Sequence, residues 1–166
     1  MSNIISLNSD TISMSNGLTD VFISVLVLSG SRLAETVDEK RLIVWLAEKD
    51  QSKVGMGTVG FDIREMPWNI ERFEESCLFM LKTVGLAKNK TDWDKLDYTP
   101  NDELLFPVLN KFSDMLSKLA AKDIDPNALG EWLADADSDD PVFLGFPKCE
   151  KHGALLSCFG CQLCNN

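Results

Sequence analysis

Apolar residues recur every three or four positions along several stretches of the chain, which is the spacing of one face of an α-helix. The longest such pattern follows Thr99-Pro100, where a capping residue precedes a proline at the first helical position. Its apolar positions are Leu105, Val108, Leu109, Phe112, Met115, Leu116 and Leu119. We expect this stretch to be the best-defined helix of the chain.

Two more helices are predicted upstream, each with a start signal. Asn69 is a capping residue type, and the glutamates after it lie where the helix dipole favours negative charge. The apolar face of this helix consists of Ile70, Phe73, Cys77, Met80, Leu81 and Val84. Thr36-Val-Asp-Glu39 forms a capping box, in which both polar side chains satisfy backbone N–H groups of the first turn. We expect the helix after it to end near Asp50.

Two weaker helical patterns lie nearer the ends of the chain. Residues 18–33 repeat apolar positions for longer than a strand needs, so we predict a helix capped by Ser15 or Asn16. Its β-branched residues would also suit a strand. Asp125-Pro126 repeats the signal of a cap followed by proline and predicts a short helix to about residue 134.

Residues 50–68 contain three glycines and a proline, which predicts a loop or a short hairpin. Apolar and polar residues alternate over residues 54–58 and again over residues 59–63, as in two paired strands. Gly55, Gly57 and Gly60 match the spacing of a dinucleotide-binding loop, but a predicted helix precedes them and Pro67 follows. We therefore interpret the glycines as turn residues.

Two segments are predicted to lack regular structure. Residues 1–17 are rich in serine and asparagine and predict a flexible or loosely packed arm, with a polar secretion leader as the alternative. Residues 131–140 carry five acids and no base, which indicates a solvated linker. The expected organisation is a mainly α domain over residues 1–140, with a short glycine-rich hairpin or loop, followed by a Cys/His tail over residues 141–166.

The net charge of the chain indicates which class of partner it can bind. The chain has 16 lysines and arginines against 26 aspartates and glutamates, which gives a net charge of −10. Affinity for phosphates rests on basic residues, so a broad nucleic-acid-binding face is excluded, and a basic protein partner fits the charge better. No apolar run is long enough to span a membrane, and the first basic residue is Arg32, so no positively charged leader region is present. We predict a cytoplasmic protein.

The tail carries the one sharp chemical motif. Two pairs, Cys149-x-x-His152 and Cys161-x-x-Cys164, are separated by eight residues. A gap of two residues lets both side chains of a pair reach one ion from a single turn, and two pairs supply the four ligands of a tetrahedral Zn²⁺. The tail resembles a small zinc ribbon or knuckle of Cys3His type. Four protein ligands leave no open position, so we expect a structural zinc.

Cys158 is a surplus thiol in the same tail. It could replace His152 or Cys161 as a ligand, or it could simply pack. The alternative to a zinc site is a disordered tail whose cysteines form disulfides. Cys77, by contrast, lies on an apolar helix face and is expected in the core.

The acidic composition, the glycine-rich loop between two helices and the Cys/His tail loosely resemble small bacterial proteins, some of them similar to immunity proteins of polymorphic-toxin systems. This resemblance implies a non-enzymatic protein that neutralises a basic, nuclease-like toxin. Candidate contact residues come from the acidic runs and are Asp135, Asp137, Asp139, Asp140, Glu71, Glu74 and Glu75.

Two alternatives stay open. Zinc modules often bind nucleic acid or act in transcription, but the bases of this tail are only Lys148, Lys151 and His152. An enzyme is the other alternative, although the sequence assembles no nucleophile, base and oxyanion donor.

Overall fold

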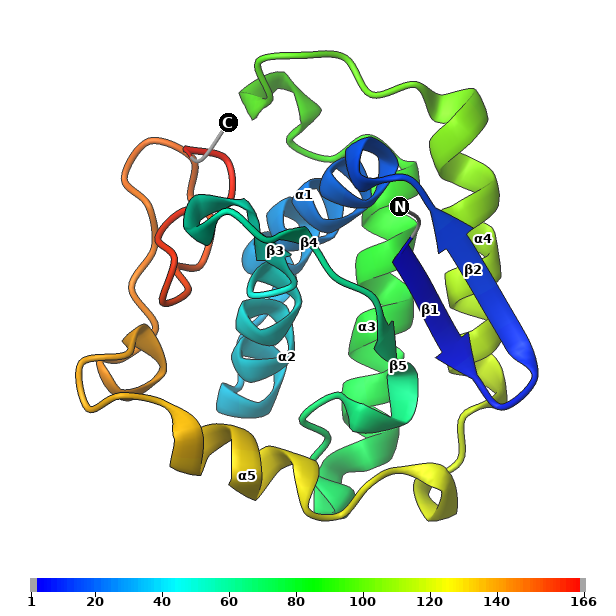
Figure 1. The fold of residues 1–166 in the computed structure, drawn as a ribbon, viewed down its shortest axis with the longest axis vertical. Helices are drawn as coiled ribbons and strands as arrows, with labels where there is room; N and C mark the ends of the chain where they lie inside the picture. Colours follow the sequence, from blue (N-terminus) through cyan, green and yellow to red (C-terminus); the bar gives the residue numbers. More distant parts are fainter. Residues whose placement is uncertain (1–2, 165–166) are drawn as a thin grey trace.

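Within residues 3–164, which the computed structural model describes, four α-helices form the body of the protein. Helix α1 (Asn16–Leu33) packs against α2 (Val37–Ala47), α3 (Phe73–Lys88) and α4 (Asp102–Lys118), as Figure 1 shows. A shorter helix, α5 (Ala128–Asp135), lies at the edge. Helical residues of all kinds make up about 54% of the structure, and strands are also present. The expected mainly α class is therefore confirmed only in part.

The predicted start signals of α1 and α2 are confirmed, whereas Asp125 does not cap α5, whose N-cap is Asn127. Ser15 caps α1, and Thr36 and Glu39 form the predicted capping box at the start of α2. In that box, Thr36 Oγ1 accepts from the Glu39 N–H at 3.2 Å and Glu39 Oε1 accepts from the Thr36 N–H at 3.1 Å. Helix α4 begins later than predicted, because Asn101 and not Thr99 is its N-cap. Asn69 caps a 3-10 turn, after which α3 begins at Phe73.

The N-terminal segment is folded, which corrects the prediction of a flexible arm. Strands β1 (Asn3–Leu7) and β2 (Asp10–Met14) pair antiparallel through a two-residue turn. Their inward side chains are buried, and these are Ile5, Leu7, Ile12 and Met14. Alternating apolar residues place one face of the hairpin against α1 and α4, although serine and asparagine fill the positions between. The part of the prediction that concerns residues 1–2 lies outside the described residues.

The glycine-rich segment contains a short hairpin, as predicted, but the predicted pairing of residues 54–58 with residues 59–63 is wrong. Strand β3 (Asp50–Gln51) pairs with β4 (Gly57–Thr58), whereas β5 (Phe61–Asp62) adds to β1 in parallel and gives the order β2-β1-β5. Gly60 makes the second pairing possible, because a Cβ atom there would collide with the backbone of Ile4. Residues 61–62, which the local alternation assigned to a hairpin, therefore pair with the edge of β1 instead.

The acidic segment 131–140 is only partly a solvated linker, contrary to prediction. Helix α5 continues to Asp135, and a 3-10 turn over Pro141–Phe143 follows shortly afterwards. Asp140 caps this turn by accepting from the Val142 N–H at 3.0 Å, and it is only 7% exposed. Asp140 is buried because its side chain caps this turn, whereas its charge alone predicted an exposed side chain.

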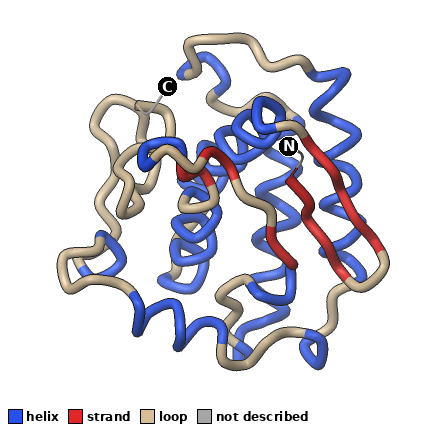
Figure 2. Tube along the Cα trace, viewed as in Figure 1, coloured by secondary structure: helices blue, strands red, loops and turns tan. Residues whose placement is uncertain are grey.

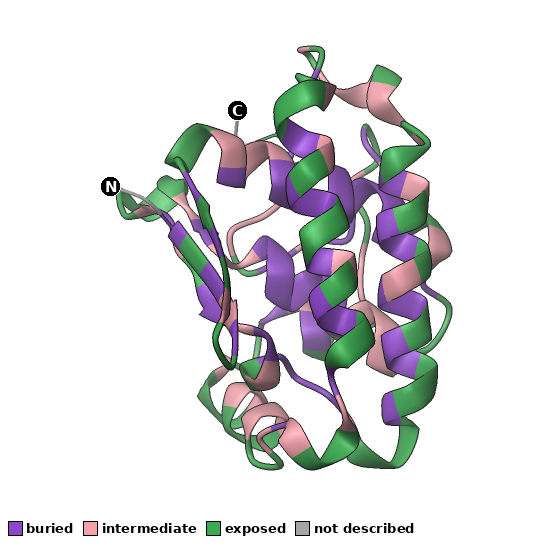
Figure 3. Cartoon of the chain, turned by 90° about the vertical axis from the view of Figure 1, so that its right-hand side faces the viewer, coloured by how far each residue is buried: buried purple, intermediate pink, exposed green. Residues whose placement is uncertain are grey.

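The tail after residue 140 is mostly loop, as Figure 2 shows, yet it packs closely against the helices. Ala154, Leu155 and Leu163 are buried and belong to the same apolar core as α1 and α2. Figure 3 shows this burial concentrated on the inward faces of the helices and of the hairpin. The predicted domain boundary near residue 140 stays a prediction. Among the described residues, no helix combines the length and apolar character needed to cross a membrane.

Candidate metal centre

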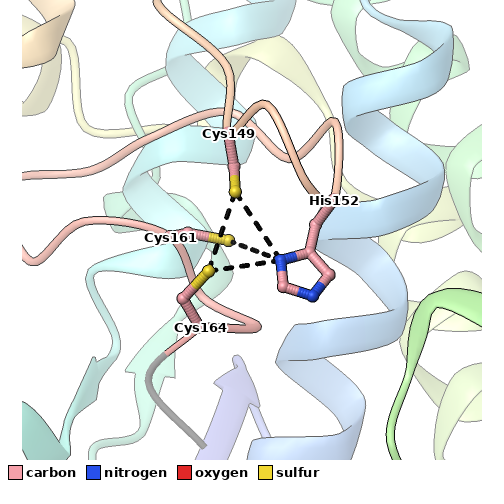
Figure 4. Close-up of side chains that lie close together, drawn as sticks. All are labelled: Cys149, His152, Cys161 and Cys164. Atoms are coloured by element: carbon pink, nitrogen blue, oxygen red, sulfur yellow. Dashed lines mark hydrogen bonds between the residues drawn. The ribbon is translucent and has the colours of Figure 1, made fainter.

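Two tight turns of the tail bring the four predicted ligands together, with their side chains converging as Figure 4 shows. The first turn holds Cys149 and His152, and its Gly153 N–H donates to Cys149 O at 2.8 Å. The second holds Cys161 and Cys164. Gly153 (φ 71°) and Gly160 (φ 89°) both adopt the left-handed conformation that side chains disfavour, as expected for residues that flank these turns.

The two turns have the same internal design. The backbone N–H groups of Lys151 and His152 donate to Cys149 Sγ, and those of Leu163 and Cys164 donate to Cys161 Sγ. The residues two and three positions after the first cysteine of each pair thus orient its sulfur. Such hydrogen bonds favour a thiolate, which is the form of cysteine that binds a metal. Sequence spacing alone predicted the pairs, and the backbone geometry shows why each pair faces one point.

The distances match the edges of a tetrahedral metal site. Zn–S and Zn–N bonds of ordinary length imply S···S edges of about 3.8 Å and S···N edges of about 3.6 Å. His152 Nδ1 lies 3.6 Å from Cys149 Sγ, 3.6 Å from Cys161 Sγ and 3.3 Å from Cys164 Sγ. Cys149 Sγ lies 3.7 Å from Cys164 Sγ, and all four ligand atoms are within 4.8 Å of one another. We call these four residues the four-ligand centre.

The thiols of the centre are held in unequal environments. Burial raises the pKa of Cys149, but donors from His152 and from the Lys151 backbone outweigh burial and lower it to about 6. Burial raises the pKa of Cys161 to about 12, because its backbone donors are insufficient to offset desolvation. A metal ion replaces the protons at such a site, so its binding depends on pH. An open pocket of about 380 Å³ lies beside His152 and Cys164.

Hydrogen bonds to α1 and to β3 anchor the tail. The Leu155 N–H donates to Ser31 Oγ at 2.9 Å, and Lys148 Nζ donates to Ser31 O at 2.9 Å. Buried Gln162 donates to Asp50 Oδ2 at 2.8 Å and to Asp20 Oδ1 at 3.2 Å. Burial, together with the hydrogen bond to Asp50, raises the pKa of Asp20 to about 6. Sequence reasoning missed these anchors, because no local pattern links residues so far apart.

Cys158 is not a ligand of the four-ligand centre. Its Sγ lies 3.8 Å from Glu48 Oε1, and the Asp140 carboxylate completes a group whose ligand atoms are all within 4.8 Å of one another. We call these three residues the Glu48 cluster. Burial raises the pKa of Glu48 to about 7, with a contribution from the charge of Asp140, against the lowering effect of a hydrogen bond from Trp132. The sequence carried no signal for this cluster.

The predicted partner-binding acids fall into two groups. Glu71, Glu74 and Glu75 are exposed at and before the start of α3. The second group begins at the end of α5 and consists of Asp135, Asp137 and Asp139, which are exposed, and Asp140, which is buried. Asp140 therefore belongs to the Glu48 cluster and not to an open surface.

Comparison of the chain with known protein families, with curated proteins and with solved structures found no match. The resemblance to toxin-immunity proteins therefore stays a prediction.

Proposed function

We propose that this chain is a non-enzymatic binding protein, stabilised by a structural zinc ion, whose partner is a basic protein. The observation that carries the proposal is the four-ligand centre. A Cys3His set is typical of structural zinc, and four protein ligands leave no position for water or substrate. The ion then serves to fold the tail onto α1 and α2, where Leu155 and Leu163 are buried.

The surface around the first turns of α3 supports binding to a basic partner. Leu78 is 52% exposed and Ile70 is 49% exposed, and they stand at the two ends of one acidic stretch. Between them lie Glu71, Glu74 and Glu75. We call these five residues the α3 face.

Hollows on both sides give the α3 face its shape. A pocket of about 440 Å³ between α3 and the end of α4 is lined mainly by apolar side chains, and Leu78 and Glu74 border it. A second pocket of about 260 Å³ lies toward α2, and three glutamates and one lysine border it together with Leu78, namely Glu35, Glu39, Glu75 and Lys82. Leu78 thus stands between two hollows with carboxylates around both.

The charges of the α3 face are largely uncompensated. Among the described residues, Glu75 pairs with Arg72 at 3.6 Å, whereas no ion pair involves Glu71 or Glu74. Free carboxylates around apolar hollows suit a partner segment that carries lysines or arginines beside apolar anchors. A basic toxin domain of nuclease type belongs to this class, which is why neutralisation of such a toxin is the specific form of the proposal.

Nucleic-acid binding through the tail has less support. Lys148 is one of the few bases of the tail, and its ammonium group already donates a hydrogen bond to the backbone of α1. The charge of −10 also opposes approach to phosphates.

The test is binding to the product of the neighbouring gene, if that product is a basic secreted domain, measured by calorimetry with purified proteins. The test variant is Glu74→Lys with Leu78→Ser. The matched control is Glu103→Lys with Leu104→Ser, because Leu104 is equally exposed on α4, next to an exposed acid. We expect the test variant to weaken binding by about a hundredfold and the control by less than about threefold. Equal effects of the two variants, or salt-dependent binding to DNA or RNA by the tail, would contradict the proposal.

A further inference from the structure

The Glu48 cluster joins three segments that are distant in the sequence. Glu48 follows the last residue of α2, Asp140 caps the turn after α5, and Cys158 lies in the loop between the two turns of the four-ligand centre. A backbone bridge between Ser157 and Gly160 shapes this loop, and Lys53 Nζ donates to Phe159 O at 2.7 Å. The position of Cys158 beside Glu48 is therefore held from both sides.

Among the described residues, no lysine or arginine forms an ion pair with the acidic groups of the cluster. Glu48 and Asp140 are carboxylates and Cys158 is a thiol, so all three groups are negative when deprotonated. Burial raises the pKa of Glu48 and the charge of the neighbouring Lys49 acts to lower it, but the Lys49 ammonium lies 3.9 Å from the centre of the Trp45 ring and makes no ion pair with Glu48. Burying acids together without an ion-paired counter-charge is unfavourable, and a bound cation would remove that penalty.

The surroundings of Glu48 resemble the outer shell of a metal site. Trp132 Nε1 donates to both carboxylate oxygens of Glu48, at 3.3 Å and 3.2 Å, which fixes the orientation of the carboxylate. Ligating carboxylates commonly have such a second partner. The distance of 3.8 Å from Cys158 Sγ to Glu48 Oε1 is close to the S···O edge of about 3.6 Å that a zinc tetrahedron implies.

We propose that Glu48, Asp140 and Cys158 form a second divalent-cation site, separate from the four-ligand centre. One sulfur and two carboxylates suit a borderline-soft ion such as Zn²⁺, whereas Mg²⁺ and Ca²⁺ prefer oxygen ligands alone. The second ion binds more weakly, since only three protein ligands hold it and water completes its coordination. It ties the end of α2, the turn after α5 and the tail to one point.

The experiment measures metal stoichiometry on the full-length chain under reducing conditions. Metal-free protein is titrated with Zn²⁺ by calorimetry, and a parallel sample is loaded with ¹¹³Cd²⁺ for NMR. The test variants are Glu48→Gln and Cys158→Ser, which keep a hydrogen-bonding side chain of similar size. Glu150→Gln is the matched control, because it removes an exposed carboxylate from the same tail without touching the cluster.

We expect two equivalents of metal in the natural chain and two cadmium resonances, because the two sites differ in their number of sulfur ligands. Each test variant should bind one equivalent and lose one resonance, whereas the control should keep both. The surviving resonance of the four-ligand centre reports that each variant is folded. A single equivalent and a single resonance in the natural chain would overturn the proposal. A second equivalent that persists in both test variants would overturn it as well.

Discussion

Removal of the metal from the four-ligand centre is expected to release residues 148–164 while the helices stay folded. Ordering the backbone of residues 149–164 costs on the order of 16 kcal/mol, at the lower end of the usual range per residue. Burial of Ala154, Leu155 and Leu163 contributes roughly 5 kcal/mol, and the hydrogen bonds to Ser31 and its neighbours contribute roughly 4 kcal/mol. The difference of about 7 kcal/mol is smaller than the binding free energy of a structural zinc, about 10–16 kcal/mol.

Hydrogen exchange and thermal unfolding measure this effect in the presence and absence of a chelator. The amides of Cys149 and Leu155 report on the tail, since they donate to Ala154 O and to Ser31 Oγ. After chelation both amides should exchange as in an unfolded chain, while the amides of α1 stay protected. Loss of the roughly 5 kcal/mol of tail packing should lower the Tm by about 10–20 °C. Cys149→Ser with Cys164→Ser should reproduce the result without a chelator.

Two outcomes would refute this reasoning. Unchanged protection of Cys149 and Leu155 after chelation would show that packing alone holds the tail. Unfolding of the whole chain would show that the tail and the helices form one cooperative unit, against the predicted boundary near residue 140. Glu150→Gln serves as the control, because it changes an exposed side chain of the same tail without removing a residue of the four-ligand centre or of the Glu48 cluster.

Two further predictions concern the remainder of the fold. Gly60→Ala should destabilise the protein by about 2–4 kcal/mol in urea unfolding, because the added Cβ collides with the backbone of Ile4 and separates β5 from β1. An unchanged unfolding midpoint would contradict the close approach of Gly60 to the Ile4 backbone. Asp20→Asn tests a pH dependence. The pKa of Asp20 is raised from 3.8 to about 6, so the folded state favours the protonated carboxyl group. The free energy of unfolding therefore falls as pH rises from about 4 through about 6. Because Asp20 is partly exposed, the loss is on the order of 1 kcal/mol, and it should disappear in the variant when the unfolding midpoint is followed from pH 5 to 7.

The features that were predicted correctly are the local ones. The capping box Thr36–Glu39 acts within one turn, so its residues alone determine its geometry. The ligand pairs Cys149–His152 and Cys161–Cys164 behave in the same way, because each pair lies in a turn built by its own backbone hydrogen bonds. The acids of the α3 face are exposed as their sequence pattern indicated, although the hollows beside them depend on α2 and α4.

The errors concern residues whose partners are distant in the sequence. Residues 61–62 looked like the second strand of a hairpin, yet they joined β1, whose edge is more than fifty positions away. Asp140 looked like a solvated acid, and Cys158 looked like a spare ligand, but tertiary packing placed both beside Glu48. Sequence by itself therefore determined the helices, the caps of α1 and α2 and the four clustered Cys and His residues, because hydrogen bonds within a turn need no distant partner. Only the tertiary structure decided the sheet order, the anchoring of the tail and the second cluster, because these depend on which buried surfaces meet when the chain packs.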